Sequence, residues 1–335
     1  MTNMASASSD SYTLSSLAGC GDWSKLVTAL GGKPILFGAG GATLARALWR
    51  LLRFARRERF DAIYVCGLRA AFFLRFMRFF LPKTAIVCGV RWNPSSSTRL
   101  DRAFSLIERC FGSLVDGYIT NSKAAKETLE RRCRIKTHKI AVIYNGVKTT
   151  SVCEREPSYE VLTVANLIWL KGHIAYLAAV KKVVSRFANA RFVFVGRDDM
   201  NGEVQREVEK QNLGEFVRFE GFCTDVAPFY RRASVFVLPS FSEGSPTSIL
   251  EAFSYALPVV AYAIDGIPEL ISGDGFLATP YDSDELAEHI LTLLENPDLA
   301  KTMGAKGRDK IAENFTLSSC AKAHSEAIGA FIRNA

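Results

Sequence analysis

The sequence predicts an α/β protein with two doubly wound parallel sheets. Short apolar runs alternate with segments of helical periodicity, as in βαβ units. A polar stretch at residues 148–158 has no apolar period and separates two such series. A length of 335 residues suits two domains better than one. We therefore expect a disordered tail at residues 1–10, a first domain at 11–147, a linker at 148–158 and a second domain at 159–316.

The first domain is expected to alternate strands with basic helices. Its candidate strands are residues 34–37, 62–65, 84–87, 117–120 and 140–143. Residues 44–57 have helical spacing, with an apolar face and a basic face. The apolar face holds Leu44, Leu48, Leu51 and Leu52, and the basic face holds Arg46, Arg50, Arg53 and Arg57. We expect this helix to cover the sheet.

A second helical segment, residues 69–81, is apolar nearly all round and is interrupted by Arg75 and Arg78. It has more aromatic surface than one core face needs. Plain burial and contact with a membrane surface are both left open for it. No eighteen-residue apolar run without charge occurs in the chain, so a membrane-spanning helix is not expected.

The second domain repeats the alternation more clearly. Its candidate strands are residues 160–165, 191–195, 217–220, 234–238, 258–262 and 275–278, and its candidate helices include 173–187, 201–212 and 283–294. Ligands of such sheets bind beyond the carboxyl ends of the strands. The residues that follow these strands are Asn166 and Lys171, Gly196 and Arg197, Phe222, Glu243 and Gly266.

Charge and cysteine content narrow the class of protein. Residues 1–150 hold 24 Lys or Arg against 9 Asp or Glu, a net charge of +15, whereas the rest of the chain carries −7. The basic half is expected to attract an anionic lipid surface or a phosphate-bearing acceptor. No nucleic-acid motif accompanies it, so nucleic acid is not an expected partner. Eight scattered Cys without a Cys-x-x-Cys pair predict neither a disulfide framework nor a zinc site and indicate a reducing compartment.

The segment 239–251 carries the most chemical information. An apolar strand leads into small residues, and Pro246 is expected to open a helix. The amides of Ser245, Thr247 and Ser248 would then lie unpaired at the positive end of the helix dipole, which attracts phosphate. Glu243 precedes this helix and Glu251 lies in its second turn. The arrangement suggests a site for a sugar nucleotide.

Four motifs in order make the chain resemble the retaining glycosyltransferases of family 4, also called group 1. The motif Glu-Gly-x-Pro-x-x-x-Leu-Glu-Ala begins at Glu243 and is followed by residues 257–261 and 266–269. Upstream lie 144–147, 165–167 with 171–173, and 194–196. The resemblance implies the GT-B fold, in which two Rossmann-like domains face each other across a cleft. It also implies that a C-terminal helix, residues 317–335, packs back toward the first domain.

The resemblance implies transfer of a sugar from a nucleotide-sugar donor, with a UDP-sugar favoured, to a lipid-linked or cell-surface polysaccharide acceptor with retention. Glu243 and Lys171 are the candidate catalytic residues. The candidate donor-binding residues are Glu251, Gly244, Ser245, Thr247, Ser248, Asn166, Gly196, Arg197 and Phe222. A pairing of Arg197 with Asp198 or Asp199 is an equally good interpretation of that residue. The enzyme is expected in the cytoplasm, on the inner face of the membrane.

Cations and aimed amides lower the barrier for departure of a diphosphate. Lys171 and the helix start at Thr247 and Ser248 would supply them, so no metal or other cofactor is expected. The only Asp-x-Asp begins at Asp282, where a helix N-cap is the better interpretation.

The chain departs from the family pattern in the first domain. No His occurs before His138, and Tyr64 and Cys66 stand near the position of the family's usual His. Asp265 stands where a Gly is usual. The first strand–helix unit is expected to be missing, although Gly38–Gly41 could be its displaced loop. A catalytically impaired nucleotide-sugar-binding remnant of the fold therefore stays open as the alternative.

Overall fold

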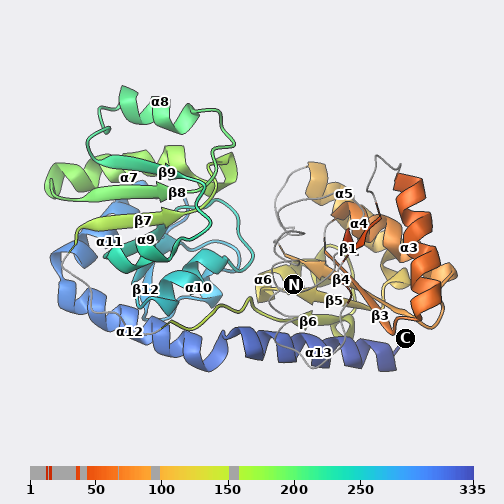
Figure 1. The fold of residues 1–335 in the computed structure, drawn as a ribbon. Coiled ribbons are helices and arrows are strands. Elements are labelled where there is room, and N and C mark those ends of the chain that lie inside the picture. The colour runs from red at the N-terminus through yellow and green to blue at the C-terminus, as the bar shows by residue number, and fades with distance from the viewer. Residues whose placement is uncertain are drawn as a thin grey trace. The chain divides into compact units, whose positions relative to one another are not determined.

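The computed structural model describes residues 13, 15–16, 35–37, 44–66, 68–91, 99–150 and 158–335. Two compact units divide the chain, as Figure 1 shows. Unit 1 comprises residues 1–144 with 317–335, and unit 2 comprises residues 145–316. The expectations for the tail at 1–10, the missing first strand–helix unit, the glycines at 38–41 and most of the linker at 148–158 lie outside the described residues.

Unit 1 contains a four-stranded parallel sheet in the order β3-β4-β5-β6. Its strands are β3 (Ala62–Cys66), β4 (Ala85–Val90), β5 (Gly117–Thr120) and β6 (Ile140–Val142). Every residue of β4 and β5 is buried, as continuous apolar runs in a covered parallel sheet require. The short strands β1 (Ser15–Ser16) and β2 (Ile35–Leu36) pair with each other in parallel.

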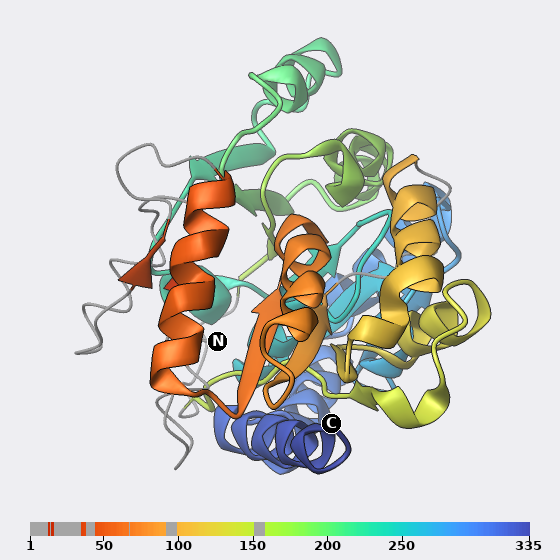
Figure 2. The same cartoon turned by 90° about the vertical axis from the view of Figure 1, so that its right-hand side faces the viewer.

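Helices cover both faces of this sheet (Figure 2). They are α3 (Leu44–Glu58), α4 (Leu68–Leu74), α5 (Arg99–Phe111), α6 (Lys123–Arg131) and α13 (Leu317–Arg333), with 3-10 turns η1 (Arg75–Phe79), η2 (Gly112–Leu114) and η3 (Thr137–Lys139). On one face, Phe331 of α13 packs with Val87 and Ile119 of the sheet. The C-terminal helix therefore belongs to the core of unit 1, although unit 2 precedes it in sequence.

Two expectations for the basic helices are wrong in detail. Leu44 is exposed at the start of α3, and Ala47, Leu51 and Ala55 form its buried stripe instead. Residues 69–81 are not one helix, because α4 ends at Leu74 and a 3-10 turn follows.

Arg75 marks that change of helix type. It lies fully buried rather than at a surface, with its Nη2 atom 2.5 Å from Oε1 of Glu108. The hydroxyl of Tyr118 donates to the other carboxylate oxygen at 2.5 Å, and Arg75 Nε donates to the carbonyl of Ala71. A buried charge needs such compensation, and this network ties η1, α5 and β5 together.

Unit 2 contains a six-stranded parallel sheet in the order β12-β11-β10-β7-β8-β9. The strands are β7 (Glu160–Val164), β8 (Arg191–Val195), β9 (Val217–Gly221), β10 (Val235–Leu238), β11 (Val259–Tyr262) and β12 (Gly275–Ala278). This is the doubly wound order, in which the first and fourth strands of the unit lie side by side. The predicted pair of parallel α/β sheets is confirmed.

Helices and 3-10 turns connect these strands. They are η4 (Trp169–Lys171), α7 (His173–Arg186), α8 (Glu203–Lys210), α9 (Ala227–Arg232), α10 (Thr247–Ser254), η5 (Ile267–Glu269), α11 (Ser283–Glu295) and α12 (Pro297–Asn314). Asp282 is the N-cap of α11 and accepts from the amides of Asp284 and Glu285, as predicted. No helix in the described residues is long and apolar enough to span a membrane.

Candidate functional site

Lys171 and Glu243 meet where the strand order of unit 2 reverses. The loop after β7 carries Lys171 and the loop after β10 carries Glu243, and these two strands are neighbours. The Lys171 Nζ atom lies 2.5 Å from Oε1 of Glu243, and their side chains are 24% and 10% exposed. Open α/β sheets bind ligands in the crevice at this switch point. The two predicted catalytic residues therefore lie together at the position that the topology favours for a ligand.

Gly172 allows the two loops to come this close. Its φ of +69° lies in the left-handed region, and a Cβ there would lie 2.1 Å from the carbonyl oxygen of Pro239. The amide of Phe241 donates to the carbonyl of Leu170 at 2.8 Å and joins the same loops. Only glycine fits this close approach without a shift of backbone.

Asp265 lies in the loop after β11 and holds the loop that carries Glu243. Its Oδ2 atom accepts from the Ser242 hydroxyl at 2.9 Å and from the Glu243 amide at 3.0 Å. The loop after β11 thus fixes the backbone that presents Glu243. The departure from the family glycine was the only signal for this residue in the sequence analysis.

The start of α10 presents backbone donors next in sequence to Glu243 and Gly244. Pro246 is the N-cap and Thr247 the first helical residue, so the expectation that Pro246 opens the helix is off by one position. Within the part of the chain that the structure describes, no carbonyl or side chain accepts from the amides of Ser245, Thr247 or Ser248. Such amides at a helix start form a site for an anion.

Asn145 fixes the loop that precedes α10. Its Nδ2 atom donates to the carbonyl of Ser245 at 2.6 Å and lies 3.4 Å from the Thr247 hydroxyl. Asn145 belongs to the motif at residues 144–147. These hydrogen bonds show that it positions the loop whose amides are expected to bind phosphate.

Glu251 lies in the second turn of α10 and is held by Tyr230. The Tyr230 hydroxyl donates to Oε2 of Glu251 at 3.0 Å, and its ring stacks on Tyr255. Burial raises the pKa of the Glu251 carboxyl, and the Tyr230 hydrogen bond opposes that rise. A carboxylate held at one oxygen can still accept hydroxyl groups at the other.

The remaining predicted donor-binding residues lie after β7, β8 and β9. Asn166 Oδ1 accepts from the Arg197 amide at 3.1 Å, and a Cβ on Gly196 would lie 2.1 Å from the carbonyl oxygen of Ala165. These contacts bring the ends of β7 and β8 together. The Arg197 guanidinium pairs with Asp199 at 2.7 Å, which is the second interpretation given to it above. Phe222 follows the edge strand β9 and is 65% exposed.

A histidine of α13 lies against the sheet of unit 1, although α13 is distant from that sheet in sequence. His324 of α13 lies buried against Tyr64, and their ring centroids are 6.0 Å apart. Arg91 Nη2 lies 3.3 Å from Nε2 of His324 and donates to the Tyr64 hydroxyl at 3.0 Å. Since arginine only donates, Nε2 accepts and Nδ1 carries the proton toward the carbonyl of Cys320. The sequence order alone could not place this histidine in the first unit.

Both buried histidines resist protonation. Burial and then Lys171 lower the pKa of His173 to about 4. Burial also lowers the pKa of His324 to about 4, assisted by Arg91 and opposed by the Cys320 carbonyl. Below pH 6.5 the unfolded chain takes up protons that the folded chain excludes.

We therefore expect the free energy of unfolding to fall as the pH drops from 6.5 to about 4, by up to ~3 kcal/mol for each buried histidine. Thermal melts across this range measure the slope. His324→Gln is expected to flatten it, whereas His138→Gln, at an exposed position, leaves it unchanged. Equal slopes for all three proteins would contradict the assignment.

Known proteins resemble this chain in sequence and in fold. Residues 158–296 match the family model described as glycosyl transferases group 1, and residues 11–151 match the model of glycosyltransferase family 4. An uncharacterized glycosyltransferase of Methanocaldococcus jannaschii is 29% identical over 210 residues, which cover 61% of this chain and 57% of that protein. The O-antigen chain mannosyltransferase B of Escherichia coli is 33% identical over 115 residues, which cover 34% of this chain and 30% of that protein. The matches thus span about half or less of these relatives.

Among solved structures, HepE of Anabaena in complex with UDP-glucose superposes with a TM-score of 0.84. The two proteins are 20% identical, and the match covers 98% of this chain and 94% of HepE. The chain therefore has the GT-B fold. The two family matches, one after the other along the chain, relate it to the group 1 glycosyltransferases.

Proposed function

We propose that this protein is a retaining, metal-independent hexosyltransferase of family 4. In this proposal it moves a sugar from a UDP-sugar to a lipid-linked or cell-surface polysaccharide acceptor. The observation that carries the proposal is the Lys171–Glu243 pair at the switch point of unit 2, next in sequence to the start of α10. HepE was crystallised with UDP-glucose, which supports the donor. The name of the O-antigen chain mannosyltransferase supports the acceptor class.

Each polar group has a role in this proposal. As the anomeric C–O bond breaks, negative charge grows on the departing diphosphate, and the Lys171 ammonium and the amides at Thr247 and Ser248 stabilise it. Glu251 accepts hydroxyl groups of the ribose. Glu243, whose backbone Asp265 fixes, accepts hydroxyl groups of the donor sugar. A cation supplied by a lysine removes the need for a divalent metal at the diphosphate.

A donor-cleavage assay tests this function. We expect the purified chain to release UDP from a UDP-sugar, and to do so at the same rate with EDTA as without it. Glu251→Gln is expected to weaken UDP binding about tenfold, since a charged hydrogen-bond acceptor becomes neutral. UDP binding without release would favour the impaired remnant, and release only with added divalent cation would contradict metal-independence.

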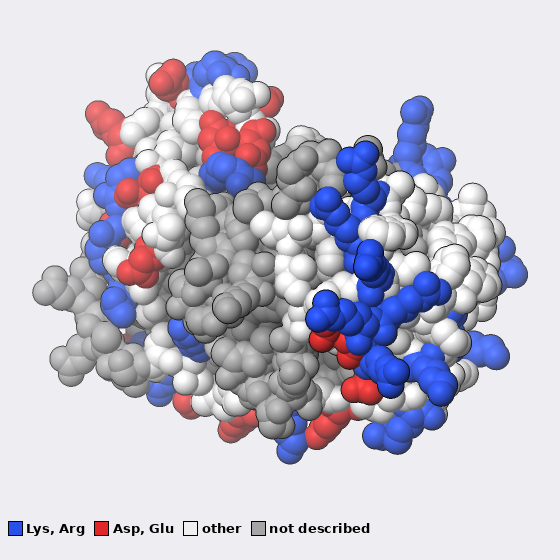
Figure 3. Space-filling view, turned by 45° about the vertical axis from the view of Figure 1, so that its right-hand side comes forward, with Lys and Arg blue, Asp and Glu red and all other residues white. Residues whose placement is uncertain are grey.

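We also propose that unit 1 docks on the anionic inner face of the membrane, in the cytoplasm. Figure 3 shows basic side chains in a band over α3, where Arg46, Arg50, Arg53 and Arg57 are exposed. Apolar side chains beside them are also open to solvent, with Trp49 58% exposed, Phe79 69% and Phe80 53%. The Arg56 guanidinium lies over the Phe80 ring, which joins α3 to the end of η1. Cationic and aromatic groups together are typical of interfacial contact.

Vesicle flotation tests the docking. The chain is expected to float with anionic vesicles at low salt, and Phe79→Ser with Phe80→Ser to lower the floating fraction severalfold, because apolar burial in the interface is lost. Leu299→Ser, which removes an exposed apolar side chain of unit 2, is the matched control and should float as the unsubstituted chain does. No flotation at low salt would refute the docking.

A further inference from the structure

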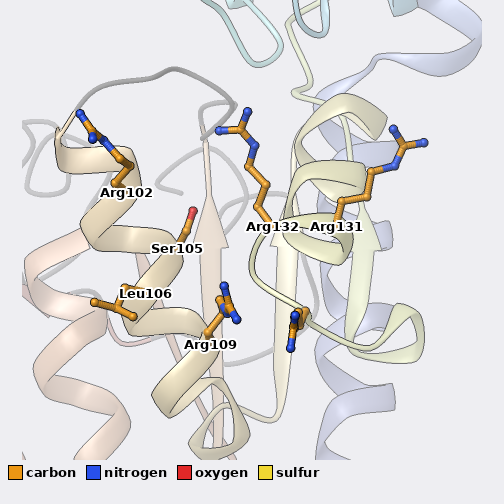
Figure 4. Close-up of a pocket in the computed structure, with 7 residues that line it drawn as sticks. Arg102, Ser105, Leu106, Arg109, Arg131 and Arg132 are labelled. Carbon is orange, nitrogen blue, oxygen red and sulfur yellow. The ribbon is translucent and has the colours of Figure 1, made fainter.

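Five arginines line one pocket between α5 and α6 in unit 1. The pocket has a volume of about 370 Å³ and is lined by Arg102, Ser105, Leu106, Arg109, Arg131, Arg132 and Arg134. Figure 4 shows side chains of both elements around the space, with Arg109 and Arg132 extending between the helices. The volume is in the range of small-molecule sites and exceeds the needs of a single phosphate.

Most of the lining arginines have no carboxylate partner among the residues that the structure describes. Among the described residues, no carboxylate forms an ion pair with Arg102, Arg109, Arg132 or Arg134. The exception in the lining is Arg131, which lies 3.6 Å from Glu127 in an exposed pair. Guanidinium groups held together without counter-charges repel each other, so the arrangement favours an anion.

The carboxylate that precedes Arg109 in sequence is turned away from the pocket. Glu108 precedes Arg109 on α5, but its side chain is 1% exposed and bonds to Arg75 and Tyr118 in the core. The core network thus removes the negative charge that would otherwise offset Arg109. On α5, the buried Glu108 is therefore paired with Arg75, whereas the exposed Arg109 has no carboxylate partner among the described residues.

Arg134 occupies a backbone position where glycine is favoured. Its φ is +58°, and the amide of Ile135, the next residue, donates back to the carbonyl of Leu129 in α6 at 3.1 Å. A side chain in this conformation costs stability relative to glycine. Arg134 therefore lines the pocket at a position where glycine would give a more stable end to the helix.

We propose that this pocket binds a ligand with a diphosphate group. Arginine forks bind phosphate oxygens through paired charge-assisted hydrogen bonds. Four of these arginines have no carboxylate partner in the described part of the chain, so they match the several negative charges of a pyrophosphate, and the volume admits two linked phosphates. The residues all belong to unit 1, so the proposal does not rest on the transferase activity of unit 2.

Calorimetric titration of the full chain with inorganic pyrophosphate tests the site. Arg109→Gln, Arg132→Gln and Arg134→Gly are each expected to weaken binding about tenfold or more, as loss of a charge-assisted hydrogen bond predicts. Arg134→Gly is also expected to melt at the same or a higher temperature, because glycine suits a positive φ. A loss of affinity in this variant then cannot come from unfolding.

Arg59→Gly is the matched control. Arg59 is an exposed arginine of unit 1 with a φ of +54°, and it follows α3 outside the pocket. Its replacement removes the same charge and the same strain, so it should leave the affinity unchanged. Pyrophosphate that binds at α10 in unit 2 would bind equally to the control and to every pocket variant. Such binding therefore cannot produce a difference between them. Equal affinity in the pocket variants and the control, or no binding at all, would overturn the proposal.

Flotation with vesicles distinguishes a lipid-borne diphosphate from a soluble one. Vesicles of phosphatidylcholine with diacylglycerol pyrophosphate are floated with the unsubstituted chain, with Arg109→Gln and with Arg59→Gly. Lower flotation of Arg109→Gln than of Arg59→Gly assigns the site to a lipid-borne diphosphate. Equal flotation together with weakened pyrophosphate binding assigns it to a soluble ligand.

Discussion

Lys171→Ala is expected to lower kcat for donor cleavage by about a hundredfold to a thousandfold, the usual cost of one group that stabilises developing negative charge. Lys171 is the cation of the pair at the switch point, 2.5 Å from Glu243. The fold is expected to persist because the side chain lies beyond the carboxyl end of β7, outside the apolar core. Initial rates at saturating UDP-sugar, with a thermal melt of each protein, measure both effects.

Lys182→Ala is the matched control for this substitution. Lys182 also belongs to unit 2 and pairs with carboxylates, lying 3.1 Å from Glu288 and 3.5 Å from Asp284. Its pairs are on the surface of α7 and α11, so the rate should not change. A Lys171→Ala protein that cleaves the donor at the unsubstituted rate would remove this lysine from the mechanism.

Arg75→Met is expected to destabilise unit 1 by about 3–5 kcal/mol, because it leaves the Glu108 carboxylate buried without its cation. Arg75 and Glu108 are 0% and 1% exposed, so water cannot replace the lost partner. This loss is a large part of the stability of an ordinary domain. Urea unfolding followed by circular dichroism should show an early transition for unit 1.

Two further variants separate charge from packing. Arg78→Met removes the next arginine along the chain, whose pair with Asp116 is part-exposed at 3.0 Å, and should cost far less. Arg75→Met combined with Glu108→Leu removes both buried charges and should recover most of the loss. A double variant as unstable as Arg75→Met alone would show that packing, and not the unpaired charge, sets the cost.

Most strands were predictable because they are short apolar runs, and the inner strands β4, β5, β10 and β11 are buried at every residue. A continuous apolar run of four to six residues bounded by polar residues identifies such a strand. Residues 117–120, 191–195 and 275–278 match β5, β8 and β12 at both ends. The segment 69–81 was less predictable, since its apolar composition does not distinguish an α-helix from a shorter helix followed by a 3-10 turn.

Site residues that follow a strand within a recognisable motif could be predicted from the sequence. Lys171 and Glu243 could be placed at strand ends, but their separation could not be, because it depends on the φ of Gly172 and on the neighbouring strands β7 and β10. Asp265 escaped prediction as the group that holds Glu243. A carboxylate in a loop has the same local pattern whether it faces solvent or another loop.

The sequence by itself determined the alternation of strands and helices, the two-domain order and the polar residues that follow each strand. Local periodicity records these features, since every residue of a buried strand or an amphipathic helix contributes to the pattern. Only the tertiary structure decided which polar groups meet. It paired Arg75 with Glu108, brought His324 to Tyr64 and gathered five arginines between α5 and α6. Such pairings depend on distance in space, and no periodicity along the chain encodes that distance.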